Sequence, residues 1–513
     1  MDRRRFLRAA SLASASALAS CVLPPSAGSP SPTEIRTPAP SPTAAPTARA
    51  PDWDALARTL KGELVRPSDA AYDAARVVYN TRFDAIRPQG IARCASVDDV
   101  RACVAFAAQT GVALALRGGG HSYGGWSTGT GLVVDTGPMN GIDLQQQGRV
   151  TVGAGAKLID VYAALARAGL GLPGGSCATV GITGLTLGGG VGVMSRSWGL
   201  TCDDLLSAEV VTADGRALVC DDQREPDLYW ALRGGGGSFG AVTSLTFRTH
   251  AAGTLALGFL SWPWTAAATV IAAWQAWQRQ ASFRLWSNLH LDSHPAGPGL
   301  SLYAVGADGP VSLRADLDRL DAASGVRATR GTQTSAFMDV MLLDAGCAGR
   351  TPSQCHLRGQ TADGQLERET YAAKSIVATD PLSADAIDAL VTGIANAPQG
   401  ISGSAIYDAL GGAVASIAPD QTAFPHRGAI GVIQLVASWS DPGHEAEALA
   451  WLRAIHAAVR AKSTAAAYAN YADPDLVDWA QAYYGQNYSR LQRVKRAYDP
   501  KELFTFPQAI RPA

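Results

Sequence analysis

Residues 174–192 read GGSCATVGITGLTLGGGVG, and glycine occupies eight of these nineteen positions. Glycine lets the backbone approach another group closely, because it carries no Cβ. A second stretch of this kind, RGGGHSYGG at residues 117–125, follows a strand-like segment. Three glycines at the end of a strand allow successive backbone N–H groups to converge on an anion. The two stretches together predict a site where the backbone wraps around a phosphate-bearing molecule.

Each of these stretches carries one side chain that could form a covalent bond. Cys177 has no obvious disulfide partner, and a cysteine inside a glycine-lined tract indicates attachment of another molecule. His121 directly follows the glycine triplet, so it would lie next to the bound anion. Taken singly, Cys177 could also be a buried core cysteine and His121 an ordinary turn histidine.

The segments around the two stretches alternate between helical and extended patterns. Residues 96–110 begin with Ser96 as a helix cap and continue with helical apolar spacing. Residues 157–169 form a second helix, which Gly169 ends. Further strands are predicted at 111–117, 131–136, 205–220 (a hairpin), 241–249, 285–292 and 430–439, and further helices at 265–281 and 443–462. This pattern is typical of an α/β or α+β protein with at least two lobes.

Length and composition limit the classes of protein that the chain can be. A chain of 513 residues predicts two or three domains. Hydrophobic residues make up 47% and charged residues 17%, which indicates a globular protein with a sizeable core. With 43 Lys+Arg against 44 Asp+Glu, no basic field is available to hold a nucleic-acid backbone. Nucleic acid is therefore not an expected partner.

The N-terminus has the features of an export signal. Residues 1–21 read MDRRRFLRAASLASASALASC, in which paired arginines followed by Phe-Leu are typical of the twin-arginine route. Cys21 follows small residues as in a lipobox, so membrane association through a lipidated Cys21 is expected. Residues 22–50 are rich in Pro, Ser, Thr and Ala and predict a semi-rigid tether. The alternatives are a basic N-terminus on a cytosolic enzyme and a cysteine placed there by chance.

An exported protein can keep disulfide bonds, so the remaining cysteines are candidates for pairing. Cys347 and Cys355 lie in a polar stretch and could clip a loop. Cys94 and Cys103 could either pack or form a bridge. These two pairs are the best candidates in the sequence.

A bridge between Cys202 and Cys220 is doubtful. If Asp214-Gly215 forms a two-residue hairpin turn, the register sets Cys220 opposite Glu209, about seven positions away from Cys202.

Other glycine motifs fail when their flanking sequence is considered. Gly235, Gly237 and Gly240 have the spacing of a dinucleotide fingerprint, but the segment after them is rich in β-branched residues and predicts a strand where a helix is needed. Residues 125–129 and 236–240 match the serine-hydrolase elbow, yet neither lies between a strand and a helix. A nicotinamide enzyme is therefore not expected, and a serine hydrolase is a weak alternative.

Four motifs taken together resemble one enzyme family. RGGGHSYGG, GGSCATVGITGLTLGGGVG, GLTCDDLLSAEVVTADG and DLYWALRGGGGSFGAVT are similar to the FAD-binding domain of the berberine bridge enzyme-like oxidases, and the C-terminal NYADPDL and YYGQNYSRLQRVKRAYDPKELFTFPQ also agree. The resemblance covers residues 55 to 513. It implies an α+β fold with a two-lobed PCMH-type FAD-binding domain and a substrate domain in which helices cover an antiparallel sheet. The corresponding boundaries are 51–250 for the FAD-binding domain, 251–462 for the substrate-binding domain and 463–513 for a segment that returns to the FAD domain.

The resemblance also implies how FAD would be held. In this family FAD is often attached by two covalent bonds. The matching positions here are His121, which would bond to the flavin 8α carbon, and Cys177, which would bond to C6. The bonds raise the flavin's potential and fix its ring. The remaining residues expected around the cofactor are Arg117, Gly118, Gly119, Gly120, Ser122, Val180, Gly181, Gly184, Gly188, Gly189, Gly190, Gly237, Phe239, Gly240, Val242 and Asn470. No metal is expected.

The catalytic residues follow from the same resemblance. Tyr471, in the Asn470-Tyr471 pair, matches the family's catalytic base, and it needs a lowered pKa or a proton acceptor because a phenol with a pKa near 10 is a poor base at pH 7. Asp408 is the candidate acceptor, and Tyr123 matches an aromatic residue that stacks on substrate. The position of Val180 is regarded as an oxygen gate, where a small residue indicates an oxidase. Three further residues are tentative substrate contacts: Gln434, Asn288 and His290.

The expected activity is oxidation of an alcohol by FAD, with O2 as acceptor and H2O2 as product. Val191 stands where plant relatives commonly have tyrosine. An apolar residue stands at the position of the glutamate base of the alkaloid-cyclising members, so ring closure is not expected. The small-molecule substrate is either a sugar or oligosaccharide, or a phenolic secondary metabolite. Alternatives are an FAD dehydrogenase with another acceptor and a protein that keeps FAD without turnover. Five tryptophans of the second lobe are considered for contact with a sugar: Trp262, Trp264, Trp274, Trp277 and Trp286. Trp274 and Trp277 lie three apart on a predicted helix and are expected to be core residues instead.

Overall fold

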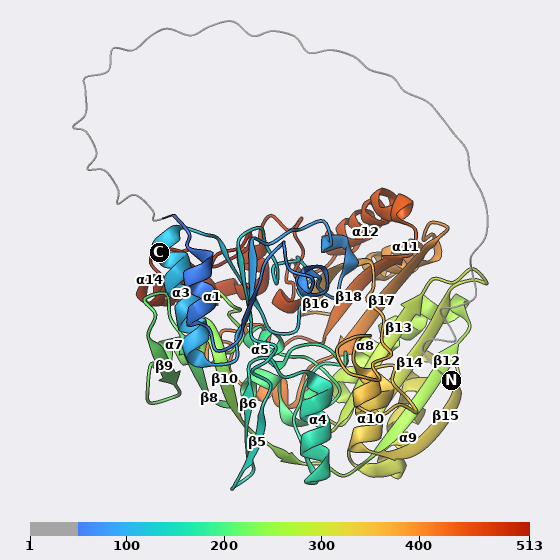
Figure 1. Cartoon of the computed structure of the whole chain (residues 1–513). Coiled ribbons are helices and arrows are strands. Elements are labelled where there is room, and N and C mark those ends of the chain that lie inside the picture. The colour runs from blue at the N-terminus through green and yellow to red at the C-terminus, as the bar shows by residue number, and fades with distance from the viewer. Residues whose placement is uncertain (1–49) are drawn as a thin grey trace, which may run out of the picture.

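The computed structural model describes residues 50–513, so the predicted signal at 1–21 and nearly all of the tether lie outside the described residues. The described chain is an α+β fold with two lobes (Figure 1). A four-stranded and a five-stranded sheet form the first lobe, and a seven-stranded sheet forms the second. In the first sheet three strands are parallel, because the helix α3 crosses over between two of them. The bounds are β1 (Glu63–Val65), β2 (Gly90–Arg93), β4 (Leu132–Asp135), β3 (Leu114–Arg117) and α3 (Val97–Thr110).

Helix α3 begins and ends as its sequence predicts. The side chain of Ser96 accepts a hydrogen bond from the backbone N–H of Asp99, and Gly111 ends the helix with a φ of 72°. Cys103 faces Cys94 from this helix with an Sγ–Sγ distance of 3.9 Å, and both side chains are fully buried. The sequence left both packing and a disulfide bridge open for this pair, and the structure shows packing without a bridge.

The second sheet is antiparallel throughout and has the strand order β5-β6-β10-β8-β9. The predicted hairpin is present, but its predicted register is wrong by one residue, because Cys220 lies opposite Ala208. The cause is a three-residue loop at 213–215, which the Asp214 carboxylate holds by accepting from the Thr212 hydroxyl at 2.6 Å. Cys202 and Cys220 form no disulfide. The strands are β5 (Ile142–Gln145), β6 (Arg149–Gly153), β10 (Ala241–Arg248), β8 (Leu205–Val211) and β9 (Ala217–Cys220).

The third sheet is also antiparallel, with the order β15-β12-β14-β13-β17-β18-β16. The helices α9, α8, α11 and α12 pack against one another and cover one of its faces (Figure 1). Trp274 and Trp277 lie in this interface and are core residues, since their exposed fractions are 0% and 4%. The strands are β12 (Thr254–Trp262), β13 (Leu285–Asp292), β14 (Gly299–Gly306), β15 (Thr329–Ala336), β16 (Tyr371–Ala378), β17 (Ile401–Ala409) and β18 (Gly431–Trp439). The helices are α8 (Ala267–Gln280), α9 (Gly309–Ser324), α11 (Ala384–Ala395) and α12 (Glu445–Arg460).

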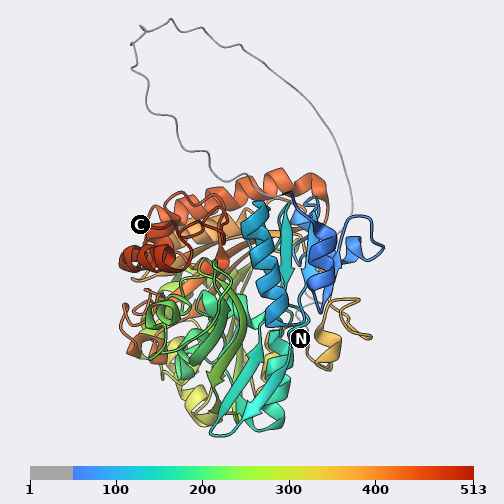
Figure 2. The ribbon, with the colours of Figure 1, turned by 60° about the vertical axis from the view of Figure 1, so that its left-hand side comes forward.

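The C-terminal segment returns to the first lobe, where helix α14 packs against α7 (Figure 2, red beside green). The buried ammonium of Lys495 joins the two parts by donating to the carbonyl oxygens of Ser238 at 2.6 Å and Phe504 at 2.8 Å, while it pairs with Asp499. The predicted domain boundaries stay predictions. The remaining elements are α1 (Trp53–Thr59), α2 (Tyr72–Arg76), α4 (Leu158–Arg167), α5 (Ile182–Leu187), α6 (Ser195–Trp198), α7 (Pro226–Ala231), α10 (Phe337–Asp344), α13 (Trp479–Tyr484), α14 (Tyr488–Tyr498), β7 (Leu170–Gly171) and β11 (His250–Ala251).

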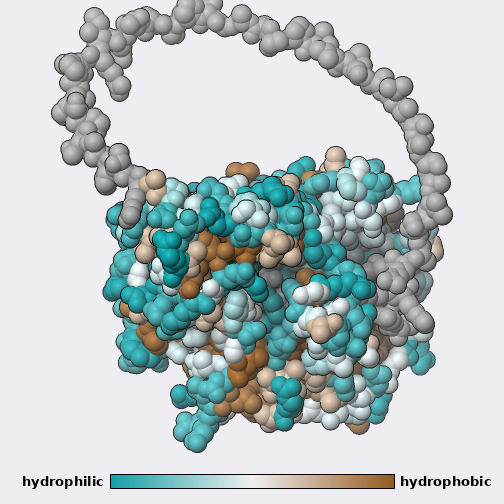
Figure 3. Space-filling model, in the orientation of Figure 1, coloured by the Kyte–Doolittle hydropathy of each residue, from teal (hydrophilic) through white to brown (hydrophobic). Residues whose placement is uncertain are grey.

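The face that Figure 3 shows is mostly hydrophilic, and apolar side chains gather there only in small areas. Large hydrophobic side chains that are well exposed lie apart in the sequence, as Phe283, Val311 and Val477 illustrate. Within residues 50–513, no helix combines the length and the apolar character that crossing a bilayer requires.

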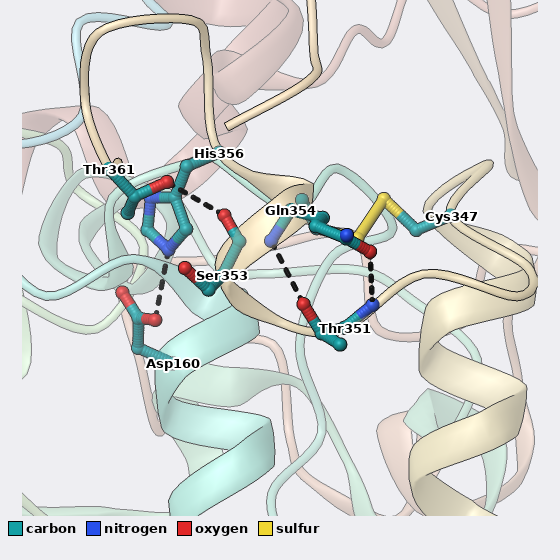
Figure 4. Close-up of a disulfide and its surroundings, with 8 residues drawn as sticks. Asp160, Cys347, Thr351, Ser353, Gln354, His356 and Thr361 are labelled. Carbon is teal, nitrogen blue, oxygen red and sulfur yellow. Dashed lines mark hydrogen bonds and ion pairs between the residues drawn. A yellow bond between two sulfur atoms is a disulfide. The ribbon is translucent and has the colours of Figure 1, made fainter. Parts of the chain in front are cut away.

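A disulfide joins Cys347 and Cys355 and clips the loop after α10, as the sequence allowed (Figure 4). Both cysteines are fully buried against Ile159 of α4 and Ala178. His356 continues from this loop and its Nε2 lies 2.9 Å from a carboxylate oxygen of Asp160 (Figure 4). The clipped loop therefore braces the segment that carries Cys177.

Replacing both Cys347 and Cys355 by alanine is expected to lower the free energy of unfolding by about 2 kcal/mol, since closing a short ring removes little entropy from the unfolded chain. Urea unfolding followed by fluorescence would measure this loss. The wild type should also lose stability in reductant, whereas the double variant should not respond to it. A double variant as stable as the oxidised wild type would contradict the role given to the bond.

Candidate active site

Two joined hollows run through the interior of the first lobe and open against the second. The larger is a cavity of about 430 Å³, and a narrower hollow of about 190 Å³ continues from it. They share lining residues, among them Gly118, Gly184, Gly237 and Phe506. The site is therefore an extended space with a narrow end enclosed by the first lobe and a wide end that β13, β17 and β18 of the second lobe also line.

Glycines make this space possible in two different ways. A Cβ on Gly119 would lie 2.1 Å from the backbone N of Gly181, so only glycine allows the two glycine-rich stretches to touch. A Cβ on Gly184 or Gly237 would meet no atom within 4 Å, although both residues line the two hollows. Gly119 and Gly181 therefore close the wall of this space, whereas Gly184 and Gly237 leave room in it for a bound molecule.

Most residues expected around the cofactor do line the hollows, but four do not. Gly188, Gly189 and Gly190 lie behind the wall, where their Cβ positions face Asn470, Phe424 and Thr201. Phe239 is fully buried in the core. These four residues lie outside the lining of the two hollows, and their contact with the cofactor stays a prediction. The residues that line the wide cavity are Gly118, Gly119, Gly120, His121, Ser122, Cys177, Val180, Gly181, Gly184, Gly237 and Asn470, and those lining the narrow hollow include Arg117, Gly240 and Val242.

His121 and Cys177 open into the same cavity. The Nε2 atom of His121 lies 2.8 Å from the hydroxyl oxygen of Thr179, and Tyr79 stacks on the imidazole with ring centres 4.0 Å apart. Burial, and then the nearby positive charge of Lys157, lower the pKa of His121 to about 3. The imidazole is therefore neutral at physiological pH, and a neutral ring nitrogen can form a bond to carbon.

Tyr471 lines the same cavity, within a group of tyrosines. Its ring stacks on Tyr123 with centres 5.2 Å apart and meets Tyr468 edge-on at 5.0 Å. The Gln434 amide donates to the Tyr123 hydroxyl at 2.6 Å. Gln434 therefore fixes the ring on which Tyr471 stacks.

Asp408 lies in the same cavity, opposite Asn288 in the pairing of β13 with β17, and accepts a hydrogen bond from the Asn288 amide. Burial first, and then the negative charge of Asp408, raise the pKa of Tyr471 well above its usual value near 10. A lowered pKa, one of the two routes considered for Tyr471, is thus contradicted. The other route, transfer of the phenol's proton to an acceptor, is the one that this arrangement allows.

Several functional residues carried no signal in the sequence. The Tyr468 hydroxyl accepts from the backbone N–H of Gly190 at 2.9 Å and from Asn470 at 2.9 Å, so it joins the C-terminal segment to the glycine stretch. Tyr79, Lys157 and Tyr371 come from segments without a motif. Thr179 could have been found, because it stands two residues after Cys177.

The tentative substrate residues Asn288, His290 and Gln434 all line the cavity, and so does Trp286, alone among the five tryptophans singled out. The indole N–H of Trp286 and the Asn288 Oδ1 are buried and have no hydrogen-bond partner among residues 50–513. Such atoms point to a polar ligand. Residues 50–513 contain no cluster of three or more His, Cys, Asp or Glu side chains that could hold a metal.

The shape and chemistry of this space fit FAD. The glycine-lined narrow end has room for a phosphate-bearing portion, and the wide end places a neutral imidazole and a thiol beside the room left for a flat ring.

Comparisons with known proteins agree with this fit. The FAD binding domain family matches residues 88–221, and the berberine and berberine-like family matches residues 467–511. The uncharacterised FAD-linked oxidoreductase YgaK of Bacillus subtilis is 32% identical over 461 residues, which cover 88% of this chain and 97% of YgaK. The xylooligosaccharide oxidase of Thermothelomyces thermophilus is 30% identical over 458 residues, 83% of this chain and 88% of that one. The solved structure of BBE-like 1 from Physcomitrella patens has a TM-score of 0.83 at 30% identity, covering 90% of this chain and 99% of that one.

Proposed function

The chain belongs to the berberine bridge enzyme-like family of FAD-linked oxidoreductases, and we propose that it oxidises a hydroxyl group of a sugar or oligosaccharide. In this proposal FAD is attached to the chain by two covalent bonds. The observation that carries the proposal is the single cavity that brings together His121, Cys177, Tyr471 and Asp408. The similarity to a xylooligosaccharide oxidase supports the sugar class. Phenolic secondary metabolites are the competing class of substrate.

His121 and Cys177 would hold FAD by one covalent bond each, and the glycines of both stretches would surround it. When bound, FAD accepts a hydride from the substrate carbon and passes the electrons to molecular oxygen. Tyr471 would accept the proton of the substrate hydroxyl at its own oxygen. Because burial keeps this phenol protonated, its own proton has to move on as the substrate's arrives, and the carboxylate of Asp408 is the acceptor that lines the same cavity.

The choice of oxygen as acceptor depends on Val180. This small residue lines the cavity and is half-buried, which leaves a path that a larger side chain would fill. An FAD dehydrogenase remains the alternative, and parallel assays with oxygen and with a dye acceptor distinguish the two. The serine-hydrolase alternative loses its support, because the chain is an FAD-linked oxidoreductase and His121 contacts Thr179 where a hydrolase needs a serine.

Acid precipitation of the holoenzyme is expected to give a yellow pellet whose intact mass exceeds that of the polypeptide by one FAD. Replacing His121 or Cys177 singly by alanine should leave one bond and a yellow pellet, and replacing both should give a colourless pellet. Peptide mapping would locate the flavin on residues 117–125 and 174–192. A colourless wild-type pellet of unmodified mass would rule out both bonds.

Substrate class is tested by peroxide release over a panel of oligosaccharides and phenols. Oxidation of an oligosaccharide at its reducing end, with one H2O2 released per carbonyl formed, is the expected result. Turnover of phenols alone would show that the substrate belongs to the phenolic class instead.

We also propose that the protein is exported by the twin-arginine route and anchored through Cys21, which lies outside the described residues. That route carries folded proteins, so the flavin could be bonded before export. Replacing Arg4 and Arg5 by lysine and following the cell fractions would test it, and unchanged export would contradict it.

A further inference from the structure

The wall of the cavity is acidic. Three carboxylate residues line it, namely Asp344, Glu369 and Asp408, whereas no lysine or arginine of the described chain does. Of the two histidines in the wall, His121 is kept neutral by burial and His290 lies 3.9 Å from the carboxylate of Asp292. Two cations lie close by but outside this wall: Lys157 is buried beside His121, and Arg117 lines the narrow hollow. A substrate that enters therefore meets carboxylates in the wall itself.

Glu369 is held at the rim of this cavity by its backbone. Its carbonyl oxygen accepts from the N–H of Thr81 at 3.0 Å, and its own N–H donates to the carbonyl oxygen of Tyr79 at 3.3 Å. Arg368, its neighbour in the sequence, pairs with Asp84, and Arg82, which follows Thr81, pairs with Glu445. Glu369 as a residue is more than a third exposed, so an incoming molecule can reach it.

Asp344 comes from a different element, the last turn of α10, just before the disulfide loop of Cys347 and Cys355. The buried phenols nearby respond to these charges. After burial, the charge of Glu369 is the next cause that raises the pKa of Tyr79, and that of Asp344 is the next cause for Tyr162 and Tyr303. The wall with Glu369 and the wall with Asp344 thus both contribute a negative electrostatic potential to the cavity.

Two buried atoms show that a polar ligand belongs in this space. Asn288 uses its amide N–H to bind Asp408, which leaves Oδ1 as an acceptor without a donor among residues 50–513, and the residue is 6% exposed. The Trp286 indole N–H is likewise a donor without an acceptor in that part of the chain, in a residue 3% exposed. A hydroxyl group can accept from the indole N–H and donate to the amide oxygen, and a protonated amine can also donate to that oxygen, so a ligand with both groups would satisfy both atoms.

We propose that this cavity selects substrates that carry a protonated amine beside the hydroxyl to be oxidised, with amino sugars as the class that fits best. The hydroxyl meets Tyr471, and the ammonium group meets the field of Glu369 and Asp344. Neutral sugars gain nothing from this field, and uronic acids are repelled by it. The preference rests on the proposed function, which it narrows from sugars to cationic sugars.

Matched oligosaccharides test the preference. We expect kcat/KM for a β-1,4 glucosamine oligomer to exceed that for its N-acetylated form and for the glucose oligomer of equal length by about tenfold or more. Raising the ionic strength from about 20 to 200 mM should reduce this advantage several-fold, since the Debye length shortens. Equal or lower values for the amine at low salt would overturn the proposal.

The variants Glu369→Gln and Asp344→Asn keep shape and remove charge, and each should reduce the amine-to-neutral ratio of kcat/KM about three- to tenfold. Glu367→Gln is the matched control, because that carboxylate is exposed, pairs with Arg358 and lies outside the cavity wall. An unchanged ratio in both cavity variants would contradict the assignment.

Binding without turnover separates this inference from the proposed function. Glucamine and sorbitol differ by a protonated amine, and each can be titrated into the holoenzyme while the flavin absorbance is followed. Tighter binding of glucamine, weakened in Glu369→Gln, would support the charge preference even if no oligosaccharide were oxidised. Equal affinity of the two compounds would reject it whatever the substrate proves to be.

Discussion

Replacing Tyr471 by phenylalanine is expected to slow reduction of the flavin by substrate about 10²- to 10⁴-fold, the range that one well-placed acid–base group contributes. Phenylalanine keeps the ring that stacks on Tyr123 and packs against Tyr468, so the wall of the cavity should keep its form. Only the oxygen that receives the substrate's proton is lost. Anaerobic stopped-flow absorbance measures flavin reduction directly, without the oxygen step.

Asp408→Asn should act in the same direction, because it removes the carboxylate to which the Tyr471 proton moves. The pKa of Tyr471 is raised, so this phenol stays protonated up to high pH and its own ionisation should give no rise in rate between about pH 6 and 9. Tyr488→Phe is the matched control, since the hydroxyl that it removes belongs to a residue outside the cavity wall, and the ring that stacks on the cavity residue Tyr484 is kept. Flavin reduction at the wild-type rate in Tyr471→Phe would place the base elsewhere.

The sequence predicted the parts of this site that lie within short motifs. His121 and Cys177 were found because each stands in a glycine-rich stretch, and Tyr471 was found because the Asn470-Tyr471 pair resembles a family motif. The fold brings all three to one cavity. Helix α3 was predicted at both ends for a similar reason, because Ser96 and Gly111 act on their own neighbours in the chain.

What the sequence did not predict depends on contacts between distant segments. Tyr79 and Glu369 are 290 positions apart, yet their backbones pair at the rim of the cavity, and neither lies in a motif. The hairpin register failed because the Asp214 side chain stabilises a loop one residue longer than the Asp-Gly pair suggests. The family resemblance places Gly188, Gly189 and Gly190 at the cofactor, whereas only the packed structure shows which atoms a Cβ at each of them would meet.

The two ways in which glycines form this space predict opposite results for two variants. Gly119→Ala adds one methyl group, but this group would lie 2.1 Å from the backbone N of Gly181 and 2.8 Å from its Cα. Backbone cannot move aside as a side chain can, so the variant should lose at least the 1–3 kcal/mol typical of overpacking and express poorly with or without flavin.

Gly184→Leu adds four carbons and should still fold, because a Cβ there meets no atom within 4 Å and leucine favours the helix α5 to which it belongs. The same side chain would fill the junction of the two hollows, where FAD is expected to lie. We therefore expect a soluble protein with an unchanged thermal transition for the flavin-free form and at least a tenfold lower ratio of flavin to protein. Gly253→Leu, at an exposed position outside both hollows, is the control that should keep its flavin. Full flavin content in Gly184→Leu would mean that the cofactor occupies some other space, whereas a variant that fails to fold even without flavin would mean that the position is packed.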